Sequence, residues 1–279
     1  MSDIRFALPK GRIQKGVVQL LDDAGIAVRA PERGYRPVVE WRDCTAKIFK
    51  PQTVVEMLAR GSRDLGFAGA DWVAELGAEL VCVLDTGLDP VQLVAAAPQG
   101  ELPAGRITIA SEYERITRSW IDRKGLSARF VRSYGATEVL PPEDADCIVD
   151  NTATGATLRA NRLEIIDTLM TSSTRLFASP QALRDATKRR AIDELVLLLK
   201  GVLDARERVL VELNVPADAV DAVVAALPAL RRPTVARLAG EGFAVKAAVP
   251  RRALATLIPA LKEGGGRDVV VSRIEQVIV

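Results

Sequence analysis

The residues of this chain that are best suited to chemistry lie between positions 145 and 158. An apolar run at 147–149 predicts a short buried strand, and Asp150 follows it directly. The small residues 154–157 (Thr-Gly-Ala-Thr) come next and open an amphipathic segment at Leu158. Small residues let backbone N–H groups approach an anion, a helix N-terminus attracts negative charge, and threonine hydroxyls add donors. The loop therefore predicts a phosphate cradle, and Asp150 could bind the hydroxyl groups of an attached sugar.

A purely structural role accounts for the same residues about equally well. Gly155 would take a positive φ in a tight turn between strand and helix, and Thr157 would cap the helix. Spacing alone does not separate a turn from a sugar-phosphate site, so both interpretations stay open at this point.

A second group of candidate residues follows the first predicted strand, residues 4–8. Lys10, Gly11 and Arg12 form a basic turn after this strand. Ligands of open α/β sheets bind at the carboxyl ends of the strands, so Lys10 and Arg12 are candidate contacts for a polyphosphate. Lys50, which precedes a helix opened by Pro51, is a further candidate cation. A solvated basic turn is the alternative.

Asp71 ends the segment 64–71, whose glycines indicate close approach of another part of the backbone. Its carboxylate could contact a ligand. It could equally cap the helix that carries Trp72 and Val73.

The composition excludes several classes of site. None of the 279 residues is a histidine, which excludes Ser-His-Asp and Cys-His nucleophilic sites and histidine-ligated metals. Lys and Arg total 38 against 36 Asp and Glu, a net charge of +2, so we expect no nucleic-acid partner. Cys44, Cys82 and Cys147 lie in or beside apolar runs without metal-type spacing, and we expect them to be small buried hydrophobes.

Length and hydropathy predict a soluble, cytoplasmic protein of two or three domains. A chain of 279 residues can bury a sizeable core. No apolar run approaches the roughly 20 residues that span a bilayer, and the N-terminus lacks a secretory pattern, so we expect no membrane partner.

The elements that must position these residues predict two α/β lobes. A hairpin is predicted from strands at 38–42 and 47–50. Strands at 80–84 and 91–97 flank a turn-rich link, where the chain could pass to a second lobe of alternating strands and helices. A β-rich stretch at 164–177 and a long helix at 181–204 would then return to the first lobe.

The last part of the chain predicts a ferredoxin-like module, because its elements follow the order βαββαβ. They are predicted at 209–214, 217–227, 235–238, 243–249, 252–262 and 268–274. The predicted domains are catalytic lobe I at 1–88 and 179–203, catalytic lobe II at 89–178, and a C-terminal module at 204–279.

Taken in order, these segments resemble the ATP phosphoribosyltransferase family. The resemblance rests on Leu8-Pro-Lys-Gly-Arg12, 49–71, 106–118, 150–158 and the final module. The resemblance spans almost the whole chain. The chain resembles the long form of the family, which carries its own regulatory domain. The resemblance implies transfer of the phosphoribosyl group of phosphoribosyl diphosphate to N1 of ATP, with release of pyrophosphate, as the first step of histidine biosynthesis. It also implies feedback inhibition by histidine.

The same resemblance implies a fold, a cofactor and an assembly. The fold is a two-lobed core like a periplasmic binding protein, followed by an ACT-like ferredoxin-like regulatory domain. The cofactor is Mg²⁺, with ligands that the sequence does not identify. The assembly is a homo-hexamer with dimers as its building blocks.

Site residues carry over from the family position by position. Asp150 and Lys10 are expected to be catalytic, and Gly11, Arg12 and Asp71 to bind substrate. The ribose and phosphate loop corresponds to Thr154, Gly155, Ala156, Thr157 and Leu158, and the effector pocket to Asn214 and Thr234.

The chain departs from related patterns at a few positions. Many phosphoribosyltransferases carry two adjacent acids, but here Asn151 follows Asp150, which separates the chain from salvage enzymes. Ala153 and Arg162 also differ from the usual family residues. The absence of histidine is no obstacle, because N1 of adenine already has a lone pair and needs no strong base. Two alternatives remain: a non-catalytic two-lobed binding protein, and a regulatory subunit that has lost catalysis.

Overall fold

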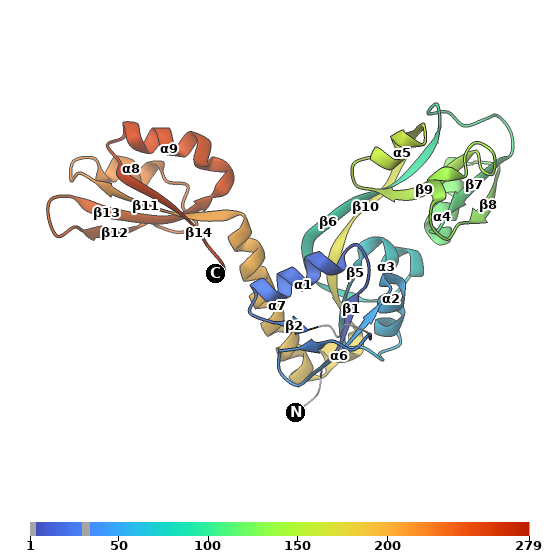
Figure 1. Ribbon diagram of the computed structural model, residues 1–279, viewed down its shortest axis with the longest axis horizontal. Helices are drawn as coiled ribbons and strands as arrows, with labels where there is room; N and C mark the ends of the chain where they lie inside the picture. Colours follow the sequence, from blue (N-terminus) through green and yellow to red (C-terminus); the bar gives the residue numbers. More distant parts are fainter. Residues whose placement is uncertain (1–3, 30–33, 279) are drawn as a thin grey trace. The chain divides into compact units, whose positions relative to one another are not determined.

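The structure is a computed structural model that describes residues 4–29 and 34–278 (Figure 1). The chain divides into two compact units, Met1–Glu194 and Leu195–Val279. The first unit is an α/β structure built on one large sheet, and the second is a smaller sheet with helices on one face. This division agrees with an α/β core followed by a C-terminal module. The finer boundaries within the core stay a prediction.

The described residues of the first unit form an eight-stranded sheet in the order β4-β1-β5-β10-β6-β9-β7-β8. Its strands are β1 (Ile4–Pro9), β4 (Cys44–Phe49), β5 (Leu65–Gly69), β6 (Val81–Pro98), β7 (Ile107–Ser111), β8 (Ala128–Arg132), β9 (Cys147–Thr152) and β10 (Leu163–Ala178). A separate ladder pairs β2 (Val28–Arg29) with β3 (Val38–Val39).

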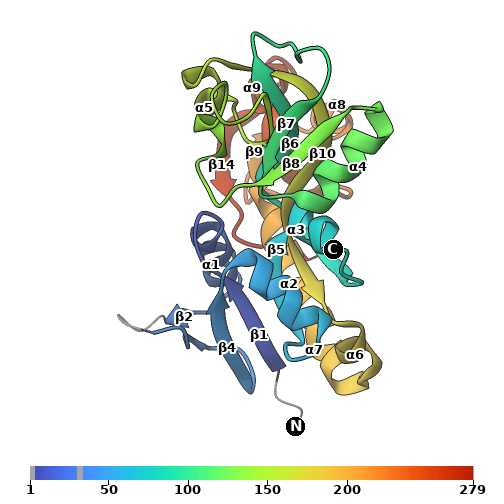
Figure 2. The same cartoon turned by 90° about the vertical axis from the view of Figure 1, so that its right-hand side faces the viewer.

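The two longest strands, β6 and β10, hold this sheet together. They run antiparallel from the pair Leu163–Pro98 to the pair Ala178–Val81. Parallel strands gather at each end of this ladder, with β4, β1 and β5 beside β10 at one end and β9, β7 and β8 beside β6 at the other (Figures 1 and 2). The result is the predicted two-lobed arrangement, with two long strands shared by the lobes.

The helices of the first unit begin and end at residues that suit those positions. Pro51 is the first residue of α2, where its missing N–H costs nothing. Gly77 and Gly125 end α3 and α4 in the left-handed conformation. The helices are α1 (Gln14–Asp23), α2 (Pro51–Ala59), α3 (Ala70–Leu76), α4 (Glu114–Lys124), α5 (Ala156–Ala160) and α6 (Pro180–Arg184), with a short 3₁₀ turn η1 (Thr137–Val139).

Three predictions about these elements are wrong. The segments 80–84 and 91–97 belong to one strand, β6, because bulges opposite Ser172–Arg175 absorb the turn-type residues between them. The predicted hairpin of 38–42 with 47–50 does not form, because β4 pairs in parallel with β1 and β3 pairs with β2.

The third error concerns the long helix predicted at 181–204. It is two helices, α6 and α7 (Ala186–Arg206), separated by Asp185 in an extended conformation. The Asp185 carboxylate accepts hydrogen bonds from the backbone N–H groups of Thr187 and Lys188. Asp185 therefore caps the start of α7, as a short acidic side chain commonly does.

The second unit confirms the predicted βαββαβ order. After the end of α7, its elements are β11 (Arg208–Val215), α8 (Val220–Ala226), β12 (Thr234–Arg237), β13 (Phe243–Pro250), a 3₁₀ turn η2 (Arg251–Ala253), α9 (Leu254–Glu263) and β14 (Arg267–Arg273). The strands described here form an antiparallel sheet in the order β12-β13-β11-β14, which is the ferredoxin-like topology.

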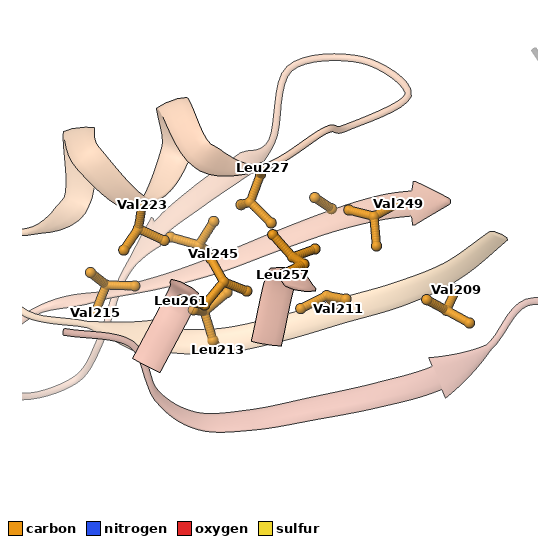
Figure 3. Packing of buried hydrophobic residues seen from close by; sticks show 11 residues of the cluster. Val209, Val211, Leu213, Val215, Val223, Leu227, Val245, Val249, Leu257 and Leu261 are labelled. Carbon is orange, nitrogen blue, oxygen red and sulfur yellow. The ribbon is translucent and has the colours of Figure 1, made fainter. Parts of the chain in front are cut away.

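Alternation along β11 creates the core of this module. Val209, Val211, Leu213 and Val215 are buried, whereas the residues between them are partly exposed. The buried side chains pack against residues of α8 and α9, including Val223 and Leu261 (Figure 3). Within the described residues of the chain, no helix is long and apolar enough to cross a membrane.

Truncating Leu261 should loosen this module. Leu261 is 0% exposed, and Leu→Ala changes in protein cores cost about 2–5 kcal/mol. Leu261→Ala should therefore speed amide hydrogen exchange along β11, measured in the full-length protein. Val270→Ala is the matched control, because Val270 is 54% exposed and surface changes usually stay within about 0.5 kcal/mol. Unchanged protection of β11 in Leu261→Ala would contradict this description of the core.

Candidate functional site

The structure brings four of the predicted site residues together. Lys10, Arg12, Asp71 and Asp150 line one pocket of about 250 Å³, although they are far apart in sequence. The other lining residues are Ile13, Pro51, Gln52, Gly69, Trp72, Glu112, Tyr113 and Asn151. The pocket draws on the ends of β1, β5, β7 and β9, the position at which open α/β sheets bind ligands.

The basic turn follows β1 and places its cations at the pocket. Gly11 takes φ +89°, a conformation that favours glycine, and it lines an adjoining apolar pocket. Lys10 Nζ donates a hydrogen bond to the Tyr35 hydroxyl at 3.2 Å and lies 4.9 Å from the centre of its ring. Lys10 and Arg12 are both exposed, and they can therefore meet an incoming anion.

Asp71 is not the cap of α3. The N-cap residue is Gly69, and Asp71 lies in the first turn, where it is 5% exposed. Its two carboxylate oxygens accept hydrogen bonds from the Ser172 hydroxyl at 2.6 Å and the Tyr113 hydroxyl at 2.7 Å. A Cβ atom at Gly69 would collide with Asp71 Oδ1. The close backbone approach that the glycines of this segment predicted is found at Gly66, where a Cβ atom would lie 3.0 Å from the backbone oxygen of Ala7.

Tyr113 is a site residue that the sequence reasoning missed. Its hydroxyl donates to Asp71 and accepts a hydrogen bond from Asn151 Nδ2 at 2.9 Å. Its ring stacks on Trp72, with ring centres 4.6 Å apart. Burial, followed by the charge of Asp71, raises the pKa of Tyr113, so the hydroxyl keeps its proton. The signal that could have identified it is its place at the junction of β7 and α4, where another strand ends.

Asp150 occupies a site that resists its ionisation. It lies within β9, two residues before the end of the strand, instead of following the strand as predicted. Burial raises the pKa of Asp150 to about 6, and the charges of Glu138 and Glu112 act in the same direction. Hydrogen bonds from the Asn151 N–H and the Thr137 side chain oppose this rise. Asp150 thus changes charge close to neutral pH.

The predicted phosphate loop follows β9 and does not itself line the pocket. Gly155 takes φ +71°, so the prediction of a positive φ is confirmed, but it is Gly155 and not Thr157 that occupies the N-cap position of α5. Thr152 and Thr154 hydroxyls accept hydrogen bonds from the N–H groups of Gly155 and Ala156. Leu158 is buried against an apolar cluster, so its side chain anchors the loop.

The other titratable candidates contribute less to the pocket. Lys50 is the N-cap residue of α2 and does not line the pocket.

The three cysteines were expected to be small buried hydrophobes. Cys147 is buried as expected, but Cys82 is exposed and Cys44 is partly exposed. Among the residues that the structure describes, no group of three or more Cys, Asp or Glu side chains is arranged to hold a metal ion.

The two predicted effector residues lie in separate pockets of the second unit. Asn214 lines a pocket of about 770 Å³ and donates a hydrogen bond from Nδ2 to Asp268 at 2.9 Å. Thr234 lines a different pocket of about 420 Å³, together with Arg231, Arg232 and Lys246. A single chain therefore does not bring Asn214 and Thr234 into one pocket.

Two family models match the chain. The model described as "ATP phosphoribosyltransferase" matches residues 50–201, which include Asp71, Asp150 and the loop 154–158. The model described as "HisG, C-terminal domain" matches residues 205–276, which correspond to the ferredoxin-like module.

Individual relatives are similar over nearly the full length. An "ATP phosphoribosyltransferase" of Chlorobium phaeovibrioides is 34% identical over 287 residues, covering 99% of this chain and 97% of the relative. That of Pelotomaculum thermopropionicum is 35% identical and covers 99% of both chains. Among solved structures, a chain of the "ATP phosphoribosyl transferase (HisG:HisZ) complex from Thermotoga maritima" is 28% identical with a TM-score of 0.65. The alignment covers 72% of this chain and 98% of that one.

The raised pKa of Asp150 predicts a pH-dependent stability. Between about pH 4 and pH 6 the folded chain keeps a proton on Asp150 that the unfolded chain releases near pH 3.8. The free energy of unfolding therefore falls as pH rises through this range. Asn cannot titrate, so its contribution does not change with pH. The free energy of unfolding of Asp150→Asn, measured relative to wild type, should therefore be about 2 kcal/mol higher at pH 7.5 than at pH 4.5.

Urea unfolding followed by tryptophan fluorescence measures this difference, because all three tryptophans lie in the first unit. Asp167→Asn is the control. Hydrogen bonds from Lys124 and Trp120 lower the pKa of Asp167, so it is ionised at both pH values. The change in the free energy of unfolding caused by Asp167→Asn should be the same at pH 4.5 and pH 7.5. If the change caused by Asp150→Asn were also the same at both pH values, the raised pKa of Asp150 would be contradicted.

Proposed function

Because this chain belongs to the ATP phosphoribosyltransferase family, in its long form, we propose that the pocket of Lys10, Arg12, Asp71 and Asp150 is its active site. The chain transfers the phosphoribosyl group of phosphoribosyl diphosphate to N1 of ATP and releases pyrophosphate, which is the first step of histidine biosynthesis. The observation that carries the assignment is the convergence in one pocket of two cations and two carboxylates from the ends of three strands, β1, β5 and β9. A non-catalytic binding protein is not favoured.

The proposed chemistry is mainly positioning and charge stabilisation. The N1 lone pair of adenine forms a bond to C1 of the ribose, and the bond from C1 to the pyrophosphate oxygen breaks. Its electron pair leaves with pyrophosphate, so negative charge grows there while the ribose becomes cation-like. Lys10 and Arg12 would stabilise the departing pyrophosphate, and ionised Asp150 would stabilise the ribose. No group in this scheme has to act as a strong base.

The loop 154–158 would hold the phosphate at the other end of the phosphoribosyl group. Its backbone N–H groups at Gly155 and Ala156 now bond to threonine hydroxyls, and a phosphate oxygen offers the same N–H groups a stronger, charged acceptor. The positive φ of Gly155 turns this backbone at the end of β9. The loop and Asp150 follow one another along the chain, so they can grip the two ends of one ribose phosphate.

Magnesium would enter with the substrate. Mg²⁺ is commonly held by one or two carboxylates together with substrate phosphates and water. The described residues contain no cluster of three acids, but Asp150 and Glu112 both line the pocket. These two carboxylates fit such a shared site, in which the ion would offset the charge of the pyrophosphate.

Histidine is the proposed inhibitor, bound in the second unit. The pocket around Asn214 contains both signs of charge, with Arg237 and Arg267 as cations and Asp218, Glu241 and Asp268 as acids. An amino acid needs both, because it carries a carboxylate and an ammonium group. We further propose a cytoplasmic homo-hexamer built from dimers, in which Asn214 and Thr234 of different chains could contribute to one effector site.

Removing the Lys10 charge should slow the reaction. Loss of one group that stabilises transition-state charge typically costs about 100- to 1,000-fold in kcat. Lys10→Met should therefore lower kcat for pyrophosphate release from ATP and phosphoribosyl diphosphate by about 100-fold or more. Lys15→Met is the matched control, since Lys15 is an exposed lysine of α1 outside the site pocket. Normal turnover of Lys10→Met would remove Lys10 from the mechanism.

Replacing Asn214 should reduce inhibition by histidine without affecting turnover. Asn214→Leu removes the amide and leaves Asp268 unpaired, so the histidine concentration for half-inhibition should rise by about tenfold, the equivalent of one hydrogen bond of about 1.4 kcal/mol. Thr256→Val, on the exposed side of α9, should leave inhibition unchanged. If both variants were inhibited like wild type, the effector site would lie elsewhere.

A further inference from the structure

Gln52 is a pocket residue with an unusual hydrogen-bonding state. It lies in the first turn of α2, directly after Pro51, and lines the pocket that contains Lys10 and Asp150. Its Oε1 atom is buried and has no hydrogen-bond partner within the part of the chain that the structure describes. Native structures pair nearly all buried polar atoms, because an unpaired one is costly. The Gln52 oxygen therefore lacks one hydrogen-bond donor.

Several polar groups that line the pocket with Gln52 already have partners. Both carboxylate oxygens of Asp71 accept hydrogen bonds, and the Tyr113 hydroxyl donates to one of them. Asn151 Nδ2 donates to Tyr113, and Lys10 donates to a tyrosine outside the pocket lining. Since no described group donates to Gln52 Oε1, a molecule bound in the pocket can supply the donor.

The substrates offer few donors of the required kind. Their phosphates at neutral pH carry acceptors, which leaves the 6-amino group of adenine and the ribose hydroxyls. Adenine presents the amino donor beside the N7 acceptor, a pair that a glutamine amide matches with its oxygen and its NH₂ group. This edge is also the one that leaves N1 free to react. Trp72 lines the same pocket as Gln52.

We propose that Gln52 recognises the adenine of ATP. Its Oε1 accepts a hydrogen bond from the 6-amino group, and its Nε2 donates one to N7. This assignment rests on the proposed active site and adds the residue that selects the base.

The same hydrogen bond acts on the reaction rate. When N1 gives its lone pair to C1, the bond from C1 to oxygen breaks and its electron pair leaves on pyrophosphate. The adenine then carries one positive charge, shared between N1 and the 6-amino nitrogen. A hydrogen bond from a positively charged donor is stronger than one from a neutral donor, so the contact with Oε1 strengthens as the reaction proceeds.

A pair of nucleotides and a pair of variants test the proposal. Purine riboside triphosphate is ATP without the 6-amino group, and calorimetry gives the dissociation constant of each nucleotide. The wild-type protein should bind ATP about 5- to 10-fold more tightly than the analogue. Gln52→Met keeps the length of the side chain and removes both polar groups, so it should bind the two nucleotides alike. Thr53→Val, on the same turn and outside the pocket lining, should keep the wild-type preference.

The outcomes separate this proposal from the active-site assignment. Equal binding of the two nucleotides by wild type would overturn the role of Gln52 even if Gln52→Met failed to fold. A preference retained in Gln52→Met, or a change confined to the KM for phosphoribosyl diphosphate, would overturn it as well. Failure of the active-site assignment would show differently, as normal pyrophosphate release by Lys10→Met.

Discussion

The antiparallel pairing of β6 with β10 is the constraint on which the first unit depends. One ladder extends from Leu163 opposite Pro98 to Ala178 opposite Val81. Each end of it supplies the edge on which a group of parallel strands is assembled. The cations that follow β1 and the acid in β9 therefore meet only because both strand groups are built on the same two strands. Lys10 and Asp150, 140 positions apart in sequence, are brought to one pocket by backbone hydrogen bonds that lie outside it.

Within the pocket, Asp71 and Asp150 have different hydrogen-bond partners. Asp71 is buried, and the hydroxyl groups of Tyr113 and Ser172 donate to its two oxygens, which fixes the orientation of its carboxylate. Asp150 is also largely buried, and its pKa is raised to about 6 because its hydrogen bonds do not offset the loss of water and the nearby acids. An acid held in this state gains most from a cationic partner, which a ribose approaching its transition state provides. Asp71 and Asp150 are both aspartates near strand ends, and what distinguishes them is the set of groups that donate hydrogen bonds to each.

Local patterns allowed part of this structure to be predicted from sequence. The turn at Gly155, the helix start at Pro51 and the βαββαβ module follow from the conformational preferences of a few adjacent residues. The pairing of strands that are distant in sequence could not be predicted from these local patterns. Gly87 and Asp89 have positive φ values typical of turns, yet they lie within β6, because a long partner strand can accommodate bulges. Tyr113 was missed for a related reason, since its role depends on contacts more than 35 residues away in the sequence.

The hydrogen bonds of Tyr113 have a fixed direction. A phenol has a single proton, and here that proton points to Asp71, so the oxygen can only accept from the residue on its other side. Asn151 donates an N–H group to the Tyr113 oxygen. An aspartate at position 151 could only accept a hydrogen bond, and the Tyr113 proton is already donated to Asp71. The asparagine that distinguishes this chain from enzymes with paired acids is thus one end of a polarised chain of donors and acceptors. The Tyr113 proton points to Asp71, and this orientation favours asparagine at position 151. Tyr113 itself lies two residues after the end of β7.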